Sequence, residues 1–347
     1  MEHAAYPGLR PALMALLACP GCRGSLEILE ATEAGADALR SGTLRCTGCA
    51  ASFAVRRGIP RFGPRPADAV ARDTAASFGY QWQSYARRIP EWRRRCQEFF
   101  GGFAPGELGR GVVLDAGCGY GRWLAEVAEG GGTIVGLDLS EAVDAAASYV
   151  GAAGDCHLVQ GDVLNPPFKP GVFETVYSIG VLHHLTRGAA EGIRALRPLV
   201  RPGGLLFVWL YGIHRGDDRP GLYPLCRRLT RRLPRPALSL LSALLAVAVS
   251  LAFVWPKRLL ALLPPTRRLS DRIPFHTYRD LPMSELRTDL FDMFATPIEH
   301  GYGRGAVRAM LEEAGLLDVD VTALGTPRNP EASWRGWGYA PRAGGAP

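Results

Sequence analysis

The stretch that decides the fold is Val112-Val113-Leu114-Asp115-Ala116-Gly117-Cys118-Gly119-Tyr120-Gly121-Arg122-Trp123. An apolar, partly β-branched run ends in an acid, passes three glycines at alternate positions and enters a helical pattern. This order predicts a strand, a tight turn and a helix. Glycines permit a sharp turn and a close approach of ligand to backbone. We therefore expect a ligand over the helix N-terminus at the carboxyl end of a parallel strand. A dinucleotide-binding fingerprint is the alternative interpretation.

The surrounding segments favour one family. Residues 112–123 resemble motif I of the class I S-adenosylmethionine (SAM) methyltransferases, in which an acid opens the glycine-rich turn. Segments that resemble the later motifs of this family follow in the same order, at Gly136–Ser140, Gln160–Val163, Phe173–Leu185 and Arg201–Val208. The resemblance implies an α/β fold with a doubly wound, mostly parallel, seven-stranded Rossmann-like sheet.

The resemblance also implies which residues bind SAM. Asp115 is expected near the methionine part, Asp138 at the ribose hydroxyls and Asp162 at the adenine amino group. The other cofactor-binding residues expected from the motifs are Gly117, Gly119, Gly121, Leu139, Val163, Ile179 and Gly180. For Asp138 and Asp162, an ordinary helix cap or turn acid is the alternative.

Two further pairs of residues have two interpretations each. Tyr80 and Trp82 lie in a Phe-Gly-x-x-Trp segment that resembles one preceding motif I in related methyltransferases. They either fold over the cofactor or only pack a helix on the sheet. His183 and His184 follow the fourth core strand, where the methyl acceptor approaches. A histidine there either removes a proton from a hydroxyl or amine acceptor, or only hydrogen-bonds the loop.

Four of the eight cysteines form two CxxC pairs, Cys19 with Cys22 and Cys46 with Cys49. Two such turns place four thiolates in a closed tetrahedral shell, which predicts a structural Zn²⁺ and not a catalytic one. Loss of the metal with survival of the fold is the alternative. The segment resembles the zinc-ribbon domain of the tRNA-methyltransferase activator family. The unpaired cysteines indicate a reducing, cytoplasmic compartment.

Length and composition set the broad class. With 347 residues, 47% hydrophobic and 21% charged, the chain is globular and large enough for several folding units. Its net charge of +7 invites an anionic partner, but nearly all basic residues are arginine, which also fits a coding bias. The expected divisions are a zinc ribbon (1–65), a linker and helical arm (66–105), a SAM-binding core (106–212), an apolar helical insertion (213–303) and a closing helix with antiparallel strands (304–347).

The insertion contains an uncharged apolar stretch, Pro236–Trp255, that is long enough to span a bilayer. A single crossing would separate the closing strands from the sheet that they must join. We therefore expect a helix that lies on a membrane surface, with a buried cap over the acceptor site or a dimer contact as the alternatives. Arginines on both sides, such as Arg231 and Arg267, slightly favour peripheral contact with the inner face of a membrane.

Three functions remain at this stage. The leading hypothesis is a SAM-dependent methyltransferase acting on a small-molecule, lipid or glycolipid acceptor. An rRNA or tRNA methyltransferase is the second hypothesis, favoured by the cysteine module and by the positive net charge. The apolar insertion and the absence of an Asn-Pro-Pro-Tyr segment disfavour it. A nucleic-acid partner is therefore less expected. A non-catalytic subunit that activates a partner methyltransferase is the third.

Overall fold

The computed structural model describes residues 6–35, 37–63, 69–151, 154–213, 223–262, 266, 270, 273, 275–326 and 329–342. The chain divides into two compact units, one formed by Met1–His214 with Ile298–Pro347 and the other by Arg215–Pro297. A linker is expected over residues 63–72. Residues 64–68 lie outside the described part of the chain, and helix α2 already begins at Ala69, within the expected linker.

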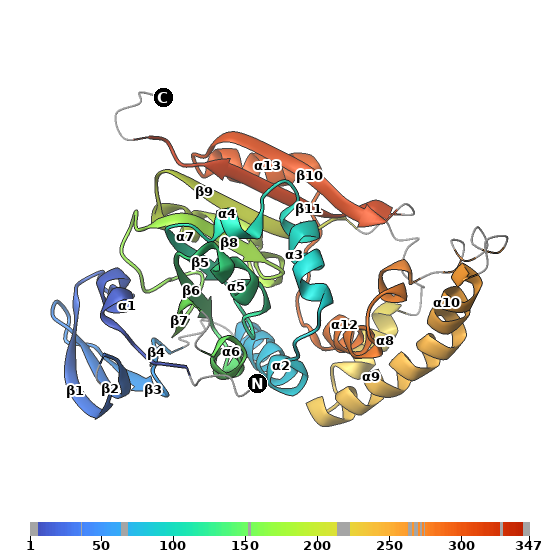
Figure 1. Ribbon diagram of the computed structural model, residues 1–347, viewed down its shortest axis with the longest axis horizontal. Coiled ribbons are helices and arrows are strands. Elements are labelled where there is room, and N and C mark those ends of the chain that lie inside the picture. The colour runs from blue at the N-terminus through green and yellow to red at the C-terminus, as the bar shows by residue number, and fades with distance from the viewer. Residues whose placement is uncertain are drawn as a thin grey trace. The chain divides into compact units, whose positions relative to one another are not determined.

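The first unit is built on a single sheet of eleven strands in the order β1-β2-β3-β4-β7-β6-β5-β8-β9-β11-β10 (Figure 1). The strands are β1 Leu26–Ala34, β2 Leu39–Cys46, β3 Ser52–Arg56, β4 Ile59–Arg61, β5 Val112–Ala116, β6 Thr133–Asp138, β7 Asp155–Gln160, β8 Phe173–Ile179, β9 Val200–Tyr211, β10 Leu317–Thr326 and β11 Asn329–Tyr339. Strands β4 through β9 run parallel, whereas β11 pairs antiparallel with β9 and with β10. The expected α/β class with a mostly parallel core is confirmed.

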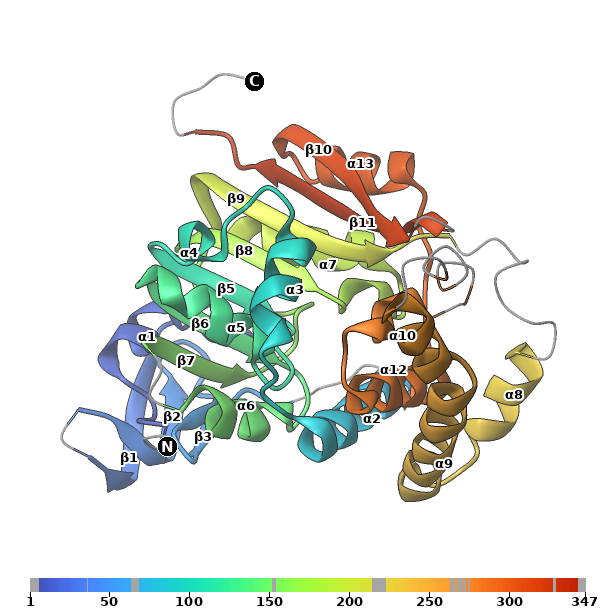
Figure 2. The same cartoon turned by 45° about the vertical axis from the view of Figure 1, so that its right-hand side comes forward.

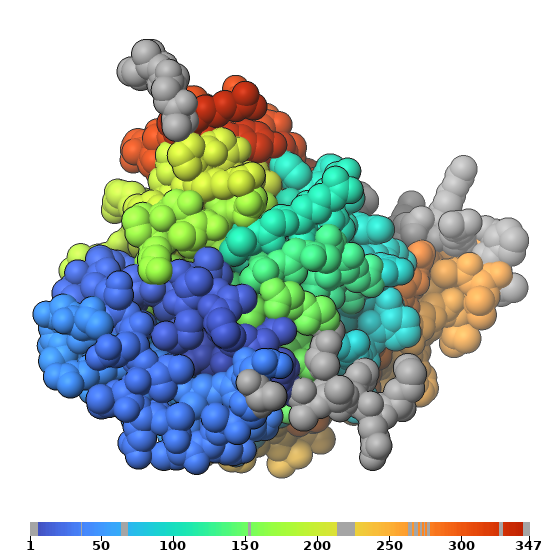
Figure 3. Space-filling view, turned by 60° about the vertical axis from the view of Figure 1, so that its left-hand side comes forward, coloured from blue at the N-terminus to red at the C-terminus, as the bar shows by residue number. Residues whose placement is uncertain are grey.

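The expected count of seven strands is wrong. Strand β4 of the N-terminal module pairs in parallel with β7 through Arg61 and Gln160, so the module's four strands extend the core sheet. This single pair leaves no periodic pattern in the sequence, which is why the module reads as a separate domain. Figure 3 shows the module, in blue, lying directly against the green core.

The core strands are apolar on both faces, as a parallel sheet covered by helices requires. Alternate residues of β5 enter two different clusters, with Leu114 on one face and Val113 on the other. The covering helices are α1 Pro11–Leu16, α2 Ala69–Tyr85, α3 Glu91–Phe100, α4 Pro105–Leu108, α5 Arg122–Val127, α6 Ala142–Val150, α7 Ala189–Leu196 and α13 Arg304–Glu313. A short 3₁₀ helix at Leu182–His184 follows β8.

The second unit is helical. Its elements are α8 Tyr223–Thr230, α9 Arg235–Val249, a π-helical turn Ser250–Val254, α10 Trp255–Leu262, a 3₁₀ helix His276–Arg279 and α12 Met283–Ala295. Together α9, the π turn and α10 form one helix of 28 residues, whose most apolar window has a mean hydropathy of 2.5. By length and composition alone this helix could cross a membrane. The chain re-enters the first unit where Tyr302 bridges Gly212, just after β9.

Candidate functional site

The glycine turn after β5 has the backbone conformation that its sequence requires. Gly117, Gly119 and Gly121 have φ values of +91°, +54° and +83°, where only glycine is unstrained. A Cβ at Gly117 would lie 2.2 Å from a methyl of Val181. The Gly117 N–H donates to the Leu137 carbonyl at 2.7 Å, so the turn is tied to the end of β6.

Asp138 joins this turn to the second motif. Its Oδ2 accepts the Gly119 N–H at 2.8 Å, and its Oδ1 accepts the Ser140 N–H at 2.8 Å and the Ser140 hydroxyl at 2.6 Å. Burial raises the pKa of the Asp138 carboxyl, and these donated hydrogen bonds oppose the rise. Leu139, expected at the same site, follows it and uses its carbonyl to accept a bond from Gln160.

Three buried polar atoms lie near the carboxyl ends of β5, β8 and β9, namely Oδ2 of Asp115, the hydroxyl of Tyr177 and Nε1 of Trp209. The Tyr177 hydroxyl interacts with the Asp115 carboxyl, whereas Nε1 of Trp209 makes no hydrogen bond within the described part of the chain. Asp115 pairs with Tyr177, and Trp209 pairs with Ile179 two residues further along β8. In-register neighbours share a face, so the three side chains lie on one face of the sheet. Unpartnered buried polar groups are costly, and a polar ligand would satisfy them.

The Asp115 carboxyl has an unusual environment. Burial raises its pKa to about 8 from an ordinary 3.8, the Tyr177 hydroxyl opposes that rise, and the negative charge of Asp138 adds to it. A carboxyl in this state favours binding of a cation that replaces its proton. SAM carries an ammonium and a sulfonium group.

Gly180 and Asp162 occupy the other expected cofactor positions. Gly180, with φ +78°, follows Ile179 at the end of β8, and a Cβ added to it would have only a Trp209 ring atom, 4.0 Å away, within reach. It therefore faces open space. Asp162 accepts the Leu164 N–H at 2.8 Å, and burial raises the pKa of its carboxyl. Val163 beside it is buried.

The two histidines differ in their surroundings. His183 is fully buried against the Tyr211 ring at a centroid distance of 4.0 Å, and neither of its ring nitrogens makes a hydrogen bond within the described residues. Burial lowers its pKa well below the usual range, so its imidazole is neutral at pH 7. The Nδ1 atom of His184 lies 2.7 Å from the Ile298 carbonyl oxygen, and the His184 ring contacts the Phe78 ring. His184 therefore ties the β8 loop to the chain that returns after the insertion.

Helix α2 lies against the glycine turn. The Trp82 Nε1 lies 3.1 Å from where a Gly119 Cβ would be, and the Trp82 ring contacts Tyr120 at a centroid distance of 5.1 Å. Tyr80, on the same helix, is half-buried. Arg122, the first residue of α5, lies 5.4 Å from the Trp82 ring and 4.8 Å from the Trp92 ring. Trp82 thus covers the turn where SAM is expected.

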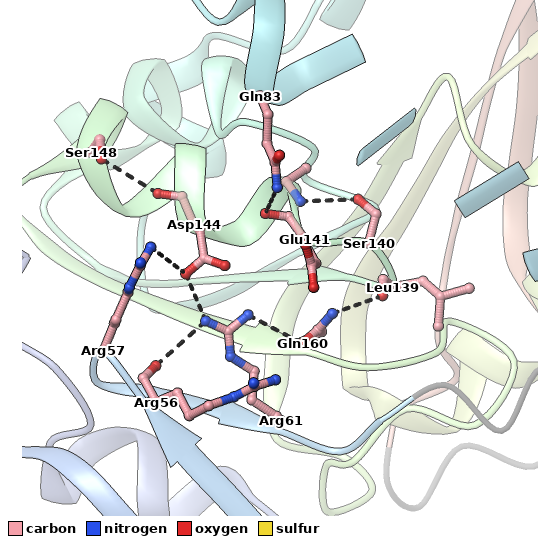
Figure 4. A network of polar contacts seen from close by, with 11 residues as sticks. Arg56, Arg57, Arg61, Gln83, Leu139, Ser140, Glu141, Asp144, Ser148 and Gln160 are labelled. Atoms are coloured by element: carbon pink, nitrogen blue, oxygen red, sulfur yellow. Dashed lines mark hydrogen bonds and ion pairs between the residues drawn. The ribbon is translucent and has the colours of Figure 1, made fainter. Parts of the chain in front are cut away.

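A buried arginine of the N-terminal module reaches the end of β7 (Figure 4). Arg61 donates to Gln160 Oε1 at 3.1 Å and to Asp144 Oδ1 of α6 at 2.7 Å. Gln160 in turn donates through Nε2 to the Leu139 carbonyl at 3.2 Å. The module is therefore connected by side chains to the residue next to Asp138.

The four cysteines come together as the CxxC spacing predicts. The Sγ atoms of Cys19, Cys22, Cys46 and Cys49 all lie within 4.8 Å of one another. Cys19 and Cys49 are separated by 3.7 Å, close to the spacing around a tetrahedral ion with bonds of about 2.3 Å. The Gly48 N–H points at the Cys46 sulfur from 3.3 Å, as it would toward a thiolate. The donor set fits Zn²⁺.

Sequence reasoning missed Tyr177, Trp209 and Arg61 as site residues. Tyr177 and Trp209 are polar-tipped residues inside apolar strands, which was the available signal. Their relation to Asp115 depends on strand register across 62 residues or more, which no local pattern reveals. Arg61 is only 7% exposed, and no sequence pattern around it indicates that its side chain is buried.

Comparison with known proteins identifies the core. Residues 113–204 match the family described as "Methyltransferase domain". A protein of Encephalitozoon cuniculi named as a methyltransferase is 42% identical over 28% of this chain and 45% of its own length. The mouse "Probable tRNA methyltransferase 9B" is 32% identical over 40% of this chain and 30% of its own length. The malonyl-[acyl-carrier protein] O-methyltransferase of Erwinia pyrifoliae is 36% identical over 38% of this chain and 48% of its own length.

These matches cover less than half of each relative's length. Among solved structures, human N-acetylserotonin methyltransferase in complex with SAM is similar at 14% identity with a TM-score of 0.47, over 80% of this chain and 60% of that one. Residues 113–204 thus match a methyltransferase domain, and the relatives named above differ in the acceptors that their names give.

Proposed function

We propose that this chain is a SAM-dependent methyltransferase that acts on a small-molecule, lipid or glycolipid acceptor. One observation carries the proposal: the buried polar groups of Asp115, Tyr177 and Trp209 lie near the strand ends, beside a glycine turn tied to Asp138. A methyltransferase needs such a site for the charged methionine end of its cofactor. Bound SAM supplies a methyl group already activated by its sulfonium.

The residues of the chain then bind, orient and exclude water. Asp115 offers a carboxylate to the cationic end, Asp138 offers acceptor atoms to the ribose hydroxyls, and Asp162 lies where the adenine is expected. Gly180 leaves room at the methionine end because it lacks a Cβ. Trp82 covers the turn and shields it from water.

The acceptor side of the site includes the His183–His184 loop. His183 keeps a lone pair at pH 7 because its imidazole is neutral, as a general base requires. Its ring has no exposed surface and packs against the rings of Tyr211 and His184, so an acceptor reaches it only after a neighbouring side chain moves. The Nδ1 atom of His184 is already hydrogen-bonded to the Ile298 carbonyl, which favours a structural role for His184 in fixing the loop.

The N-terminal module is proposed to hold a structural Zn²⁺ through Cys19, Cys22, Cys46 and Cys49. Four thiolates close the shell and leave no open position for water, so the ion stabilises the fold and does no chemistry.

Methyl transfer from SAM to RNA is the second candidate function. It is supported by the similarity to the tRNA-methyltransferase relative and by the net charge of +7. The deciding experiment transfers radiolabelled methyl from SAM to a native extract, separated afterwards into lipid, small-molecule, protein and RNA pools. We expect label in the lipid or small-molecule pool. The Asp138→Ala variant should lose this label, and the control Asp37→Ala, which replaces an exposed acid of the N-terminal module, should retain it. Label in RNA would replace the first candidate by the second. Failure to bind SAM in a calorimetric titration would instead favour the non-catalytic subunit.

A further inference from the structure

The long helix of the second unit carries its apolar residues on the outside. Between Pro236 and Leu262 every exposed residue is apolar. The largest recur every three or four positions and form what we call the apolar stripe, namely Leu240, Leu244, Val247, Leu251, Trp255 and Leu259. Leu240 and Leu259 are 62% and 65% exposed. Contiguous exposed apolar surface of this kind marks an interaction site.

The serines and the lysine of the same helix face inward. Ser239, Ser242, Ser250 and Lys257 are all buried. Ser239 accepts a hydrogen bond from Arg287 of α12 at 2.9 Å, and Lys257 donates to the Ser270 carbonyl at 2.8 Å. Figure 2 shows α9 and α10 as one continuous rod, and α12 packs against α9. A helix on the surface of a water-soluble unit has the opposite arrangement, with its polar face outward.

The charges around the stripe indicate what covers it. From residue 219 to residue 270 the sequence has ten basic residues and no acidic one. Arg228, Arg231 and Arg232, at the end of α8 and just after it, are exposed. A basic segment beside an apolar helical face fits the anionic headgroups and acyl chains of a bilayer surface, where tryptophan is also favoured.

A membrane crossing does not fit the sheet. Strand β9 precedes the insertion and β11 follows it, yet the two strands pair directly, from Leu205 with Tyr339 to Tyr211 with Ser333. One crossing would place them on opposite sides of the bilayer. A helix that lies in the plane of the surface leaves both strands on one side.

We propose that the apolar stripe docks the protein on an anionic lipid bilayer, with the helix parallel to the surface and the α8 arginines at the headgroups. This surface is independent of methyl transfer. A protein that binds vesicles without transferring methyl groups would satisfy this proposal and contradict the proposed function, so the two fail separately.

Vesicle flotation with the full chain tests the proposal, using pure phosphatidylcholine and a three-to-one mixture with phosphatidylglycerol. We expect binding to the mixed vesicles that is about tenfold stronger than to the neutral ones and that weakens with salt. The triple variant Leu244→Gln/Leu251→Gln/Leu259→Gln should bind the mixed vesicles with an affinity at least tenfold lower than that of the wild type. Because all three side chains are exposed, the change leaves no cavity. Arg228→Gln/Arg231→Gln/Arg232→Gln should lose only the preference for anionic lipid.

The matched control is Ile28→Gln/Leu29→Gln/Leu317→Gln, which removes exposed apolar side chains from β1 and β10 and should bind vesicles like the wild type. The proposal would be overturned if the stripe variant bound the mixed vesicles as strongly as the wild type, or if the wild type did not bind them. So would a wild-type dimer in light scattering that the stripe variant converts to a monomer without any vesicle binding, because the stripe would then join two copies of the chain.

Discussion

Arg61 and Gln160 lie 99 residues apart in the sequence, and their side chains meet at 3.1 Å where the N-terminal module joins the core sheet. The same two residues are the register pair of β4 and β7. Because Gln160 also holds the Leu139 carbonyl, Arg61 supports the turn that contains Asp138 without touching the cofactor position itself.

Replacement of Arg61 by leucine should therefore weaken SAM binding by about tenfold, in proportion to the loss of one or two buried charged hydrogen bonds. Calorimetric titration measures the affinity and thermal unfolding reports the fold. Arg57→Leu is the matched control, since Arg57 lies 3.7 Å from the same Asp144 carboxylate but is 80% exposed. Equal affinities in the two variants would show that Arg61 serves stability alone.

Asp115 should make the protein less stable as pH rises. Its folded pKa of about 8 exceeds the ordinary 3.8, so between these values the folded state binds more protons than the unfolded state. The free energy of unfolding then falls with rising pH, by at most about 1.4 kcal/mol per unit from this group. Asp115→Asn cannot titrate, so its stability relative to the wild type should increase from pH 4 to pH 8. Urea unfolding at several pH values measures the difference, and parallel profiles would contradict the assigned environment.

The space beside Gly180 should be needed by the cofactor. Gly180→Ala adds a methyl group where the nearest atom is 4.0 Å away and forces alanine into φ +78°. We expect a loss of about 1–2 kcal/mol in stability from the backbone and at least a tenfold loss in SAM affinity. Gly171→Ala supplies the control, because its φ of +64° is similar and an added Cβ has no atom within 4 Å, but Gly171 lies in the turn before β8. If both variants bind SAM equally, the open space is not the cofactor site.

Removal of the metal should destabilise more than the N-terminal module. The purified protein should contain one equivalent of zinc by elemental analysis, and a chelator should lower the melting temperature by more than 10 °C, given that structural zinc contributes several kcal/mol. Cys22→Ser should lose the metal, whereas Cys226→Ser, an exposed cysteine of α8, should retain it. Because β4 is part of the core sheet, chelation should also weaken SAM binding. A full zinc equivalent in Cys22→Ser would refute the four-cysteine site.

The core strands could be located from the sequence with little error. The apolar runs predict core strands over residues 112–116, 133–138, 156–160, 173–179 and 204–211. The first, second and fourth match the structure residue for residue, whereas β7 begins at Asp155 and β9 begins at Val200. Strands buried on both faces are continuous apolar runs bounded by turn residues, so their ends are visible in one dimension. The closing hairpin is predicted less accurately, over residues 317–322 and 333–339, whereas β10 continues to Thr326 and β11 begins at Asn329. Half-exposed strand ends carry no such signal.

Contacts distant in sequence were beyond prediction. The cysteine cluster was predictable because its spacing alone fixes the geometry. The Asp115–Tyr177 pair and the Arg61–Gln160 pair depend on which strands are neighbours. The orientation of the long helix could not be read from its composition either, because the buried serines and the exposed leucines alternate within one apolar stretch.

The bridge between Gly212 and Tyr302 makes the insertion a cassette. Its two ends leave and re-enter the sheet at neighbouring positions, so exchanging it for a short linker would change only a loop, and loop closure depends weakly on length. Evolution can therefore add, shorten or replace this element without disturbing the strands on either side. Under the proposed membrane docking, replacing this element would change which surface the protein binds and leave the residues proposed to hold SAM unaltered.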